Sequence, residues 1–361
     1  MKKDNILVSS LPVKPQNITN IGMMMAPTVM NYLGDVLECD KMISFNILHS
    51  YSDKADELDV YIDDVKKSGI SYDKIFIDSQ KANELLEFIE KMYYTKQIIE
   101  KNKKIIRCEC GKVDLEKDAI NNNAKLYTIK NGKIYCNQCN TECKEYDETS
   151  LVLEVKNEKD IFIIPNYLNR DIQSINKLFI NKDILISKGR NTNYSLNLNG
   201  KKYNVDIDFL WSNYFKLFDK ETQIYIASNH QLFAMFLMNY ISKISSDKKL
   251  IFVATPYLNV DLKKAWNEYN LKELKEFKSL LLLYNMRWKN KDCAWDEAIA
   301  AYLNTISETK IKNLYKAMIL DSKQYINDEN FAKSLNDAIV KSTNMQNNIR
   351  VMKKYYKEGL L

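Results

Sequence analysis

The stretch ILVSSLPVKPQNITNIGMMM, residues 6–25, decides the fold class. Its apolar start, Ile6–Leu11, predicts a buried strand, and Gly22–Leu37 has the apolar spacing of a helix. Met42–Leu48 then predicts a second strand and Ala55–Lys67 a second helix. Strands that alternate with helices form parallel βαβ units, so the sequence predicts an α/β fold with a doubly wound, Rossmann-type sheet.

The composition is that of an ordinary globular protein. The chain has 361 residues, of which 45% are hydrophobic and 28% charged, which suits one large α/β domain with additions. The net charge of +6 permits an acidic partner such as RNA without demanding one, and a solvated lysine-rich surface explains it more simply. The first apolar run is too short for a signal peptide, and no stretch approaches the ~20 apolar residues of a membrane span. We therefore expect a cytoplasmic protein without a membrane partner.

Further along the chain the pattern changes twice. Gln80–Glu100 predicts a long helix, and polarity then rises over Ile105–Glu148, which has the turn residues and weak periodicity of an insertion. The α/β alternation returns where ETQIYIAS and KKLIFVAT, residues 221–228 and 248–255, flank a predicted helix at His230–Ser245. The predicted parts are 1–104 for the first half of the Rossmann-type domain, 105–150 for the insertion, 151–265 for the second half, and 266–361 for a helical C-terminal domain that packs against the sheet.

The insertion contains two close groups of cysteines. Cys108 and Cys110 precede Cys136 and Cys139, and the two pairs stand 26 residues apart, a spacing that suits a tetrahedral thiolate site. Four thiolates leave no open position, so the metal would be a structural zinc ion. The Cys-x-Cys half is less usual than Cys-x-x-Cys, which leaves Cys143 as an alternative ligand in place of Cys110. The remaining alternative is a set of free surface cysteines.

The order of these parts resembles that of class I aminoacyl-tRNA synthetases, and most closely that of methionyl-tRNA synthetases. ILVSSLP is similar to that family's strand into TSALPY, and NITNIGMMM stands where its His-Ile-Gly-His motif would stand. YNVDIDFLWSNYF resembles YVWFDALINYI, and residues 290–319 resemble the start of the anticodon-binding helices. The resemblance runs in order over residues 5–320. It implies ATP-dependent amino-acid activation and transfer to tRNA as the ancestral chemistry, with a zinc-bearing insertion.

The chemical positions of the first motif have changed. In that family two histidines donate hydrogen bonds to the phosphates of ATP, whereas Asn20 and Met23 stand in their places here. Asn20 can still donate, but Met23 cannot, and losing one such donor costs on the order of 10²–10³ in rate. Gly22 remains, and it would let the backbone approach a nucleotide. The resemblance thus implies a nucleotide subsite at Pro12, Asn20 and Gly22.

The substrate pocket has changed as well. The family's GTDEHG region, whose aspartate holds the substrate amino group, reads LHSYSD here, and the tryptophan of its methionine pocket falls at Asp206. In contrast to a pocket role, the helical spacing of Trp211, Tyr214 and Phe215 predicts core side chains. The resemblance implies a pocket at Leu11, His49, Asp206 and Tyr214.

Few polar groups remain that could carry catalysis. TPYLNVDLKKAW stands in place of the Lys-Met-Ser-Lys-Ser loop, so only Lys263 or Lys264 could offer a cation to a phosphate. His230 follows a predicted strand and is the candidate general base. His49 also follows a predicted strand, and open α/β sheets bind ligands at such strand ends. The simpler interpretation is that each histidine caps a turn.

Two hypotheses for the function follow. In the first, the chain is an enzyme that binds ATP with an amino acid or another carboxylate and performs an altered adenylation or acyl transfer. In the second, it is a catalytically inactive paralogue that binds tRNA or a protein, and the tail NIRVMKKYYKEG with Tyr355 and Tyr356 would suit RNA. An intact but divergent synthetase is a weaker third. An enzyme should keep an open pocket with His49, Asn20 and His230 converging on it, whereas a binding module could let Met23, Met24 and Met25 fill it.

Overall fold

The computed structural model describes most of the chain. The described residues are 4–12, 21–48, 55–116, 126–188, 193–259 and 307–343, with shorter pieces at 283, 286, 288, 292–294, 305, 350 and 353–360. Among them, no helix has the length and apolar character that a membrane span requires.

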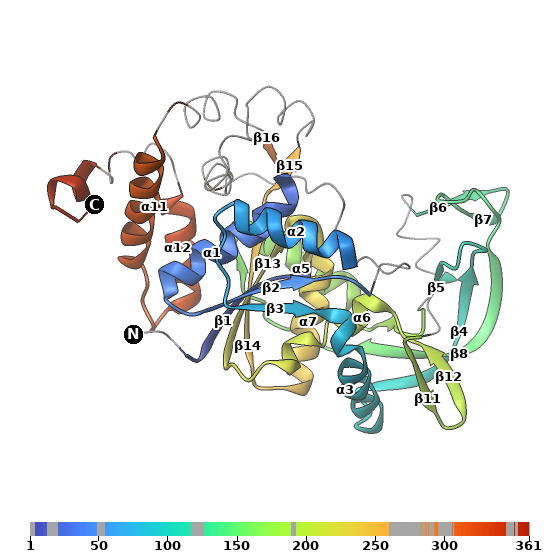
Figure 1. The fold of residues 1–361 in the computed structure, drawn as a ribbon. Coiled ribbons are helices and arrows are strands. Elements are labelled where there is room, and N and C mark those ends of the chain that lie inside the picture. The colour runs from blue at the N-terminus through green and yellow to red at the C-terminus, as the bar shows by residue number, and fades with distance from the viewer. Residues whose placement is uncertain are drawn as a thin grey trace.

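A six-stranded parallel sheet forms the centre of the molecule (Figure 1). Its strands follow the order β3-β2-β1-β13-β14-β9, so the direction in which strands are added reverses between β1 and β13. This is the order of a doubly wound fold, and ligands bind such folds at the reversal point. The strand bounds are Lys74–Ile77 for β3, Asp40–Phe45 for β2, Ile6–Ser10 for β1, Thr222–Ser228 for β13, Lys249–Thr255 for β14 and Ile163–Ile164 for β9.

Both faces of this sheet are covered, which explains why its central strands are buried along most of their length. All five residues of β1 are buried; Ile6 and Val8 join one hydrophobic core, and Leu7 joins the other. The first core contains residues of α1 (Met25–Leu37) and α2 (Ala55–Lys67). The second contains residues of α3 (Ala82–Tyr94), α5 (Asn169–Phe179), α6 (Ile207–Trp211) and α7 (Leu232–Ser245).

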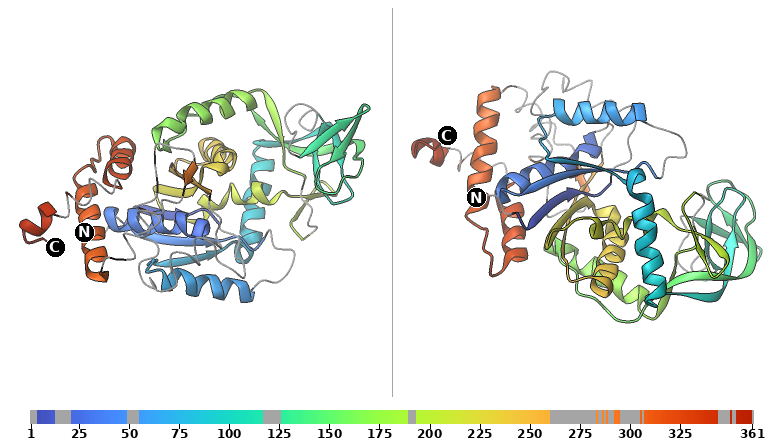
Figure 2. Two further views of the ribbon diagram at one scale, coloured as in Figure 1. Left: turned by 90° about the horizontal axis from the view of Figure 1, so that it is seen from above. Right: turned by 60° about the horizontal axis from the view of Figure 1, so that its bottom comes forward.

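A second, antiparallel sheet carries the insertion. Its strand order is β10-β8-β4-β5, and the long strands β4 and β8 pair from Ile98 with Leu153 to Arg107 with Lys144. Both views in Figure 2 place this sheet at one end of the molecule and the C-terminal helices at the other. The strand bounds are Ile98–Arg107 (β4), Val113–Leu115 (β5), Lys144–Val155 (β8) and Lys182–Leu185 (β10), and the hairpins are Tyr127–Lys130 with Lys133–Cys136 (β6, β7) and Ser195–Leu198 with Lys201–Asn204 (β11, β12).

Two sequence predictions were wrong in this region and beyond it. The helix predicted over Gln80–Glu100 ends at Tyr94, because Lys96 adopts a positive φ of 59° and the chain turns into β4. The C-terminal part is also not wholly helical, since β15 (Tyr257–Asn259) pairs in parallel with β16 (Asp292–Ala294). A strand of three residues has too little pattern to be recognised from sequence.

The helices α11 (Glu308–Lys323) and α12 (Phe331–Ser342) confirm the predicted helical packing against the sheet domain. Met318 of α11 and Leu335 of α12 belong to the same core as α1. A polar network reinforces this contact, since the Tyr315 hydroxyl donates to Asp35 Oδ2 at 2.7 Å and the Asn31 amide donates to Tyr315 at 2.8 Å. The C-terminal helices are therefore part of the main domain.

Candidate functional site

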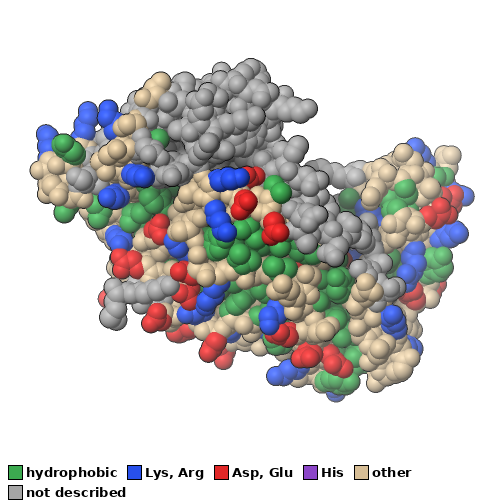
Figure 3. Space-filling view, in the orientation of Figure 1, with side chains coloured by type: hydrophobic (Ala, Val, Ile, Leu, Met, Phe, Trp, Pro, Cys, Tyr) green, Lys and Arg blue, Asp and Glu red, His purple; other side chains and the backbone are tan. Residues whose placement is uncertain are grey.

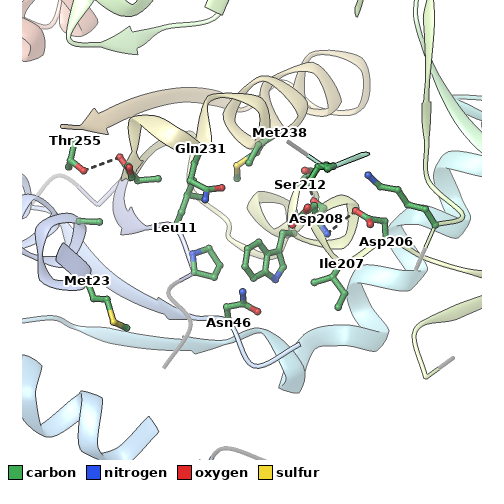
Figure 4. A pocket seen from close by; sticks show the side chains of 18 of the residues that line it. Leu11, Met23, Asn46, Asp206, Ile207, Asp208, Ser212, Gln231, Met238 and Thr255 are labelled. Carbon is green, nitrogen blue, oxygen red and sulfur yellow. Dashed lines mark hydrogen bonds between the residues drawn. The ribbon is translucent and has the colours of Figure 1, made fainter. Parts of the chain in front are cut away.

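The candidate site is a cavity of about 820 Å³ at the carboxyl ends of the parallel strands. Its wall comes from the segments after β1, β2, β13 and β14, together with α6, α7 and the insertion. Figure 4 shows Asn46, Gln231 and Met238 facing a common space from different elements. Further lining residues, both apolar and polar, are Ala26, Val113, Ile207, Asp208, Ser212, Ala227, Ala234 and Thr255.

The nucleotide side of the predicted site lies in this wall. Pro12 and Gly22 line the cavity, next to Leu11 of the predicted substrate pocket, whose backbone N–H donates to the Ile226 carbonyl at 2.7 Å. Met23 lines the cavity as well, and its carbonyl accepts from the Tyr61 hydroxyl at 3.0 Å. Met24 and Met25 turn into the core instead. The methionines therefore do not fill the cleft. Asn20, predicted beside them, lies outside the described residues.

Three residues of the predicted substrate pocket are described, and of these Leu11 and Asp206 line the cavity whereas Tyr214 does not. Asp206 lines the cavity and caps the N-terminus of α6, because its carboxylate accepts from the N–H groups of Asp208 and Phe209 at 3.1 and 3.3 Å. Tyr214 is fully buried, stacks in the core 4.9 Å from the ring of Tyr225, and is not among the residues that line the cavity. The spacing argument for a core aromatic thus describes Tyr214 better than the pocket prediction.

Most of the predicted catalytic residues lie outside the described part of the chain. Lys263, Lys264 and the pocket residue His49 lie outside the described residues. His230 is exposed at the turn after β13, where its backbone N–H donates to Ser228 Oγ at 3.3 Å. Its ring stacks on Tyr257 at 4.3 Å with an interplanar angle of 10°. From this turn Ser228 and Gln231 line the cavity, whereas His230 is not among the lining residues.

Sequence reasoning missed two residues of this site, Trp211 and Asp78. Trp211 lines the cavity, and its indole N–H donates to Asp78 Oδ2 at 2.7 Å. Asp78 follows β3, is fully buried, and also accepts the N–H groups of Ile47 and Leu48 at 2.7 and 3.2 Å. Burial raises the pKa of the Asp78 carboxyl, and these hydrogen bonds oppose that rise. No local pattern links Asp78 with Trp211, since 133 residues separate them.

The insertion supplies the far wall of the cavity. Lys112, Val113, Asp114 and Leu126 line it. Lys112 is held by the Tyr127 ring, whose centroid is 4.5 Å from Nζ, and the Tyr127 hydroxyl donates to Asp114. The insertion and the parallel-sheet domain therefore both line the cavity.

The insertion also contains a cluster of four cysteines that could hold a metal ion. The Sγ atoms of Cys108, Cys110, Cys136 and Cys139 all lie within 4.8 Å of one another. Zinc–sulfur bonds of about 2.3 Å place tetrahedral ligands about 3.8 Å apart, and Cys110 and Cys136 stand at 3.8 Å. The donor set and spacing therefore suit a structural zinc ion, as predicted.

The turns of the two cysteine pairs support this interpretation. Gly111 and Asn140, which follow the pairs, adopt positive φ values of 85° and 56°. These conformations favour Gly and Asn, and they let the chain fold back so that Cys108 N–H donates to the Lys112 carbonyl at 2.9 Å and Cys136 N–H to the Thr141 carbonyl at 3.0 Å.

The alternative ligand set, with Cys143 in place of Cys110, is not favoured, because the cluster of four sulfur atoms includes Cys110 and not Cys143. Cys143 is buried in the small core of the insertion, and burial raises the pKa of its thiol to about 12. Burial likewise raises the pKa of the Cys110 thiol to about 11, whereas hydrogen bonds from Cys108 and Thr141 lower the pKa of the Cys139 thiol to about 6. The position of the sulfur atoms, and not the pKa, therefore separates Cys110 from Cys143.

The tail that was predicted to suit RNA is only partly exposed. Both basic and acidic side chains lie on the face seen in Figure 3. In the tail, Tyr356 is 70% exposed, but Tyr355 is buried against Ala317 and its hydroxyl accepts from Gln324. Tyr355 is therefore not available to stack on a base.

Comparison with known proteins identifies the fold. No family model matches the sequence, and no curated protein is significantly similar to it. Among solved structures, Mycobacterium tuberculosis methionyl-tRNA synthetase in complex with methionyl-adenylate matches with a TM-score of 0.61 and 11% identity, over 98% of this chain and 84% of that chain. The free-state form of that enzyme matches with a TM-score of 0.60 and 11% identity, over 98% and 81%. The chain has the fold of methionyl-tRNA synthetase.

This fold confirms the predicted class I synthetase-like architecture. The match covers nearly the whole chain, so the insertion and the C-terminal helices belong to the shared fold as well as the sheet. At 11% identity the methionyl-tRNA synthetase likeness concerns the backbone arrangement, and the chemistry rests on the side chains described above.

Proposed function

We propose that the cavity binds ATP together with an amino acid or another small carboxylate, and that the chain performs an adenylation or acyl transfer changed from that of a methionyl-tRNA synthetase. The observation that carries this proposal is the open cavity of about 820 Å³ at the reversal point of the sheet. Cavities of this size accommodate a drug-sized ligand, and a chain that had become only a binding scaffold would not need to keep one.

The wall supports distinct roles for its parts. Gly22 has no side chain, so the backbone at the start of α1 can lie close to a nucleotide. Ser228, Gln231 and Thr255, at the ends of β13 and β14, offer hydroxyl and amide groups that can bind and orient polar parts of a ligand. Asn46, from the end of β2, offers an amide on another side.

The same wall explains why the reaction would be changed. Met23 faces the cavity with a thioether that cannot donate a hydrogen bond to a phosphate. Stabilisation of the developing charge must then come from Asn20, Lys263 or Lys264, which we propose for this role from sequence. His230 is the proposed general base; it stands at the end of β13 beside the lining residues Ser228 and Gln231. The four cysteines of the insertion would hold a structural zinc ion, which orders the wall and takes no part in the reaction.

The test is binding followed by turnover. Isothermal titration calorimetry with ATP and magnesium should detect binding, and pyrophosphate release should then depend on one or a few amino acids among the twenty. Ala234→Trp would place an indole in the cavity and should abolish ATP binding. Phe233→Trp is the matched control, because Phe233 precedes Ala234 on α7, is 36% exposed and does not line the cavity.

The outcome separates the two hypotheses. Binding that Ala234→Trp removes and Phe233→Trp retains would place the nucleotide in this cavity. An absence of ATP binding at millimolar concentration would refute the adenylation proposal, and the inactive paralogue that binds tRNA or a protein would then be the better hypothesis.

A further inference from the structure

A buried carboxylate connects two walls of the cavity. Asp78 directly follows β3 and is fully buried, and its two oxygens accept hydrogen bonds from different segments. Oδ1 accepts the N–H groups of Ile47 and Leu48, which directly follow the lining residue Asn46. Oδ2 accepts the indole N–H of Trp211, which lines the cavity from α6. One side chain therefore fixes the segment after β2 and the tryptophan relative to each other.

The hydrogen bond to Asp78 determines how Trp211 presents its ring. An indole has one donor and no acceptor, so an N–H that is aimed at a buried carboxylate fixes the orientation of the whole ring system. Hydrogen bonds to charged groups are about twice as strong as neutral ones, which makes this orientation rigid. The helix that carries Trp211 is itself fixed, because Asp206 caps its start and Ser212 Oγ donates to the Asp208 carbonyl at 2.7 Å.

We propose that Trp211 is the specificity-determining residue of the cavity and that Asp78 is its positioning residue. The inference rests on the proposed function, since it concerns which substrate side chain the cavity accepts. The flat, immobile ring faces a ligand as a rigid apolar wall, and rigid walls discriminate between side chains by shape. Neighbouring lining residues such as Met23 and Met238 are flexible and adapt to different shapes, so they discriminate less.

Three substitutions separate positioning from general stability. Trp211→Phe retains an aromatic wall but removes the N–H, so the ring can rotate. Asp78→Asn retains the shape of the carboxyl group but places an NH₂ group against one of its donors. Asp73→Asn is the matched control: Asp73 precedes β3 at the opposite end, and its Oδ2 also accepts a backbone N–H, that of Lys41, at 2.9 Å.

The first readout needs no ligand. In protein labelled with ¹⁵N-tryptophan, the indole resonance of Trp211 is assigned by its loss in Trp211→Phe. We expect this resonance to move upfield in Asp78→Asn, because its hydrogen bond weakens, and to stay in place in Asp73→Asn. An unmoved resonance in Asp78→Asn would overturn the positioning role.

The second readout is selectivity, measured as amino-acid-dependent pyrophosphate release with ATP across the twenty amino acids. Trp211→Phe and Asp78→Asn should lower the ratio of kcat/KM for the best amino acid over the next by tenfold or more, chiefly through KM. Asp73→Asn should leave the ratio unchanged. An unchanged ratio in both variants of an active enzyme would overturn the inference while the proposed function stands. If wild-type protein binds no ATP, the proposed function fails and selectivity with it, and the resonance alone then decides the positioning role.

Discussion

Gly34→Ala should destabilise the protein, although alanine is the better helix former. A Cβ atom at Gly34, in the last turn of α1, would lie 2.1 Å from Lys41 Cγ and 2.4 Å from Cδ. Lys41 cannot simply swing away, because its ammonium group donates to Asp35 at 2.7 Å, to Asn31 at 3.3 Å and to Ser71. The added methyl group must therefore break these hydrogen bonds.

The magnitude follows from two opposing terms. Replacing glycine by alanine within a helix is worth about 1 kcal/mol of stabilisation. Losing hydrogen bonds to a charged group costs about 1.5–3 kcal/mol. The net expectation for Gly34→Ala is a loss of about 0.5–2 kcal/mol in the free energy of unfolding. In a Lys41→Ala background the clashing atoms are gone, so the same substitution should stabilise by up to about 1 kcal/mol.

Urea unfolding followed by far-UV circular dichroism measures both backgrounds under one set of conditions. The reversal of sign is the decisive result, since a general intolerance of α1 to substitution would destabilise in both backgrounds. Stabilisation by Gly34→Ala in the wild-type background would refute the close contact between the helix and Lys41.

Two further predictions concern the insertion and the antiparallel sheet that carries it. Zinc analysis of purified protein should find about one zinc ion per chain. This ion should be lost in Cys139→Ser and retained in Cys143→Ser, because Cys139 belongs to the cluster of four and Cys143 does not. Loss of zinc in both variants would contradict this ligand set. Acid should destabilise the antiparallel sheet that carries the insertion. The hydrogen bond from Lys101 lowers the pKa of Glu154 below its usual 4.5, so the stabilisation by this pair is complete above that value and is lost as the pH falls through the lower folded-state pKa. Between about pH 6 and about pH 3, the urea midpoint of unfolding should fall less in Lys101→Met than in wild type. An equal fall in both proteins would contradict a contribution from the ion pair.

The sequence predicted the elements whose pattern is local and continuous. The bounds of α2, Ala55–Lys67, agree with prediction because its apolar residues follow one helical period throughout. The end of α3 was not predicted, because the residue that adopts the left-handed conformation after it is Lys96, and not the glycine that usually marks the end of a helix. Ile98 and Ile99 then continue the apolar pattern into β4, so the periodicity alone did not mark the boundary.

The site was predicted less completely, because its residues meet through the fold. The four zinc-binding candidates could be found, since close cysteine pairs are a local signal. The family resemblance predicted Asp206 and Gly22 as site residues, and both line the cavity. Trp211 was interpreted as core because helical spacing does not say which face borders a cavity, and Asp78 carried no motif at all.

The packing of the C-terminal helices against α1 also affects the order in which the chain can fold. Tyr32 and Ser322, which share a buried hydrogen bond, are 290 residues apart in sequence. At synthesis rates of about 5–20 residues per second, the second partner leaves the ribosome roughly 15–60 s after the first. For that interval the N-terminal half holds an apolar helix face with nothing to cover it. A nascent chain of this architecture is therefore a natural client for chaperones, and its longest-range contacts will be among the last to form.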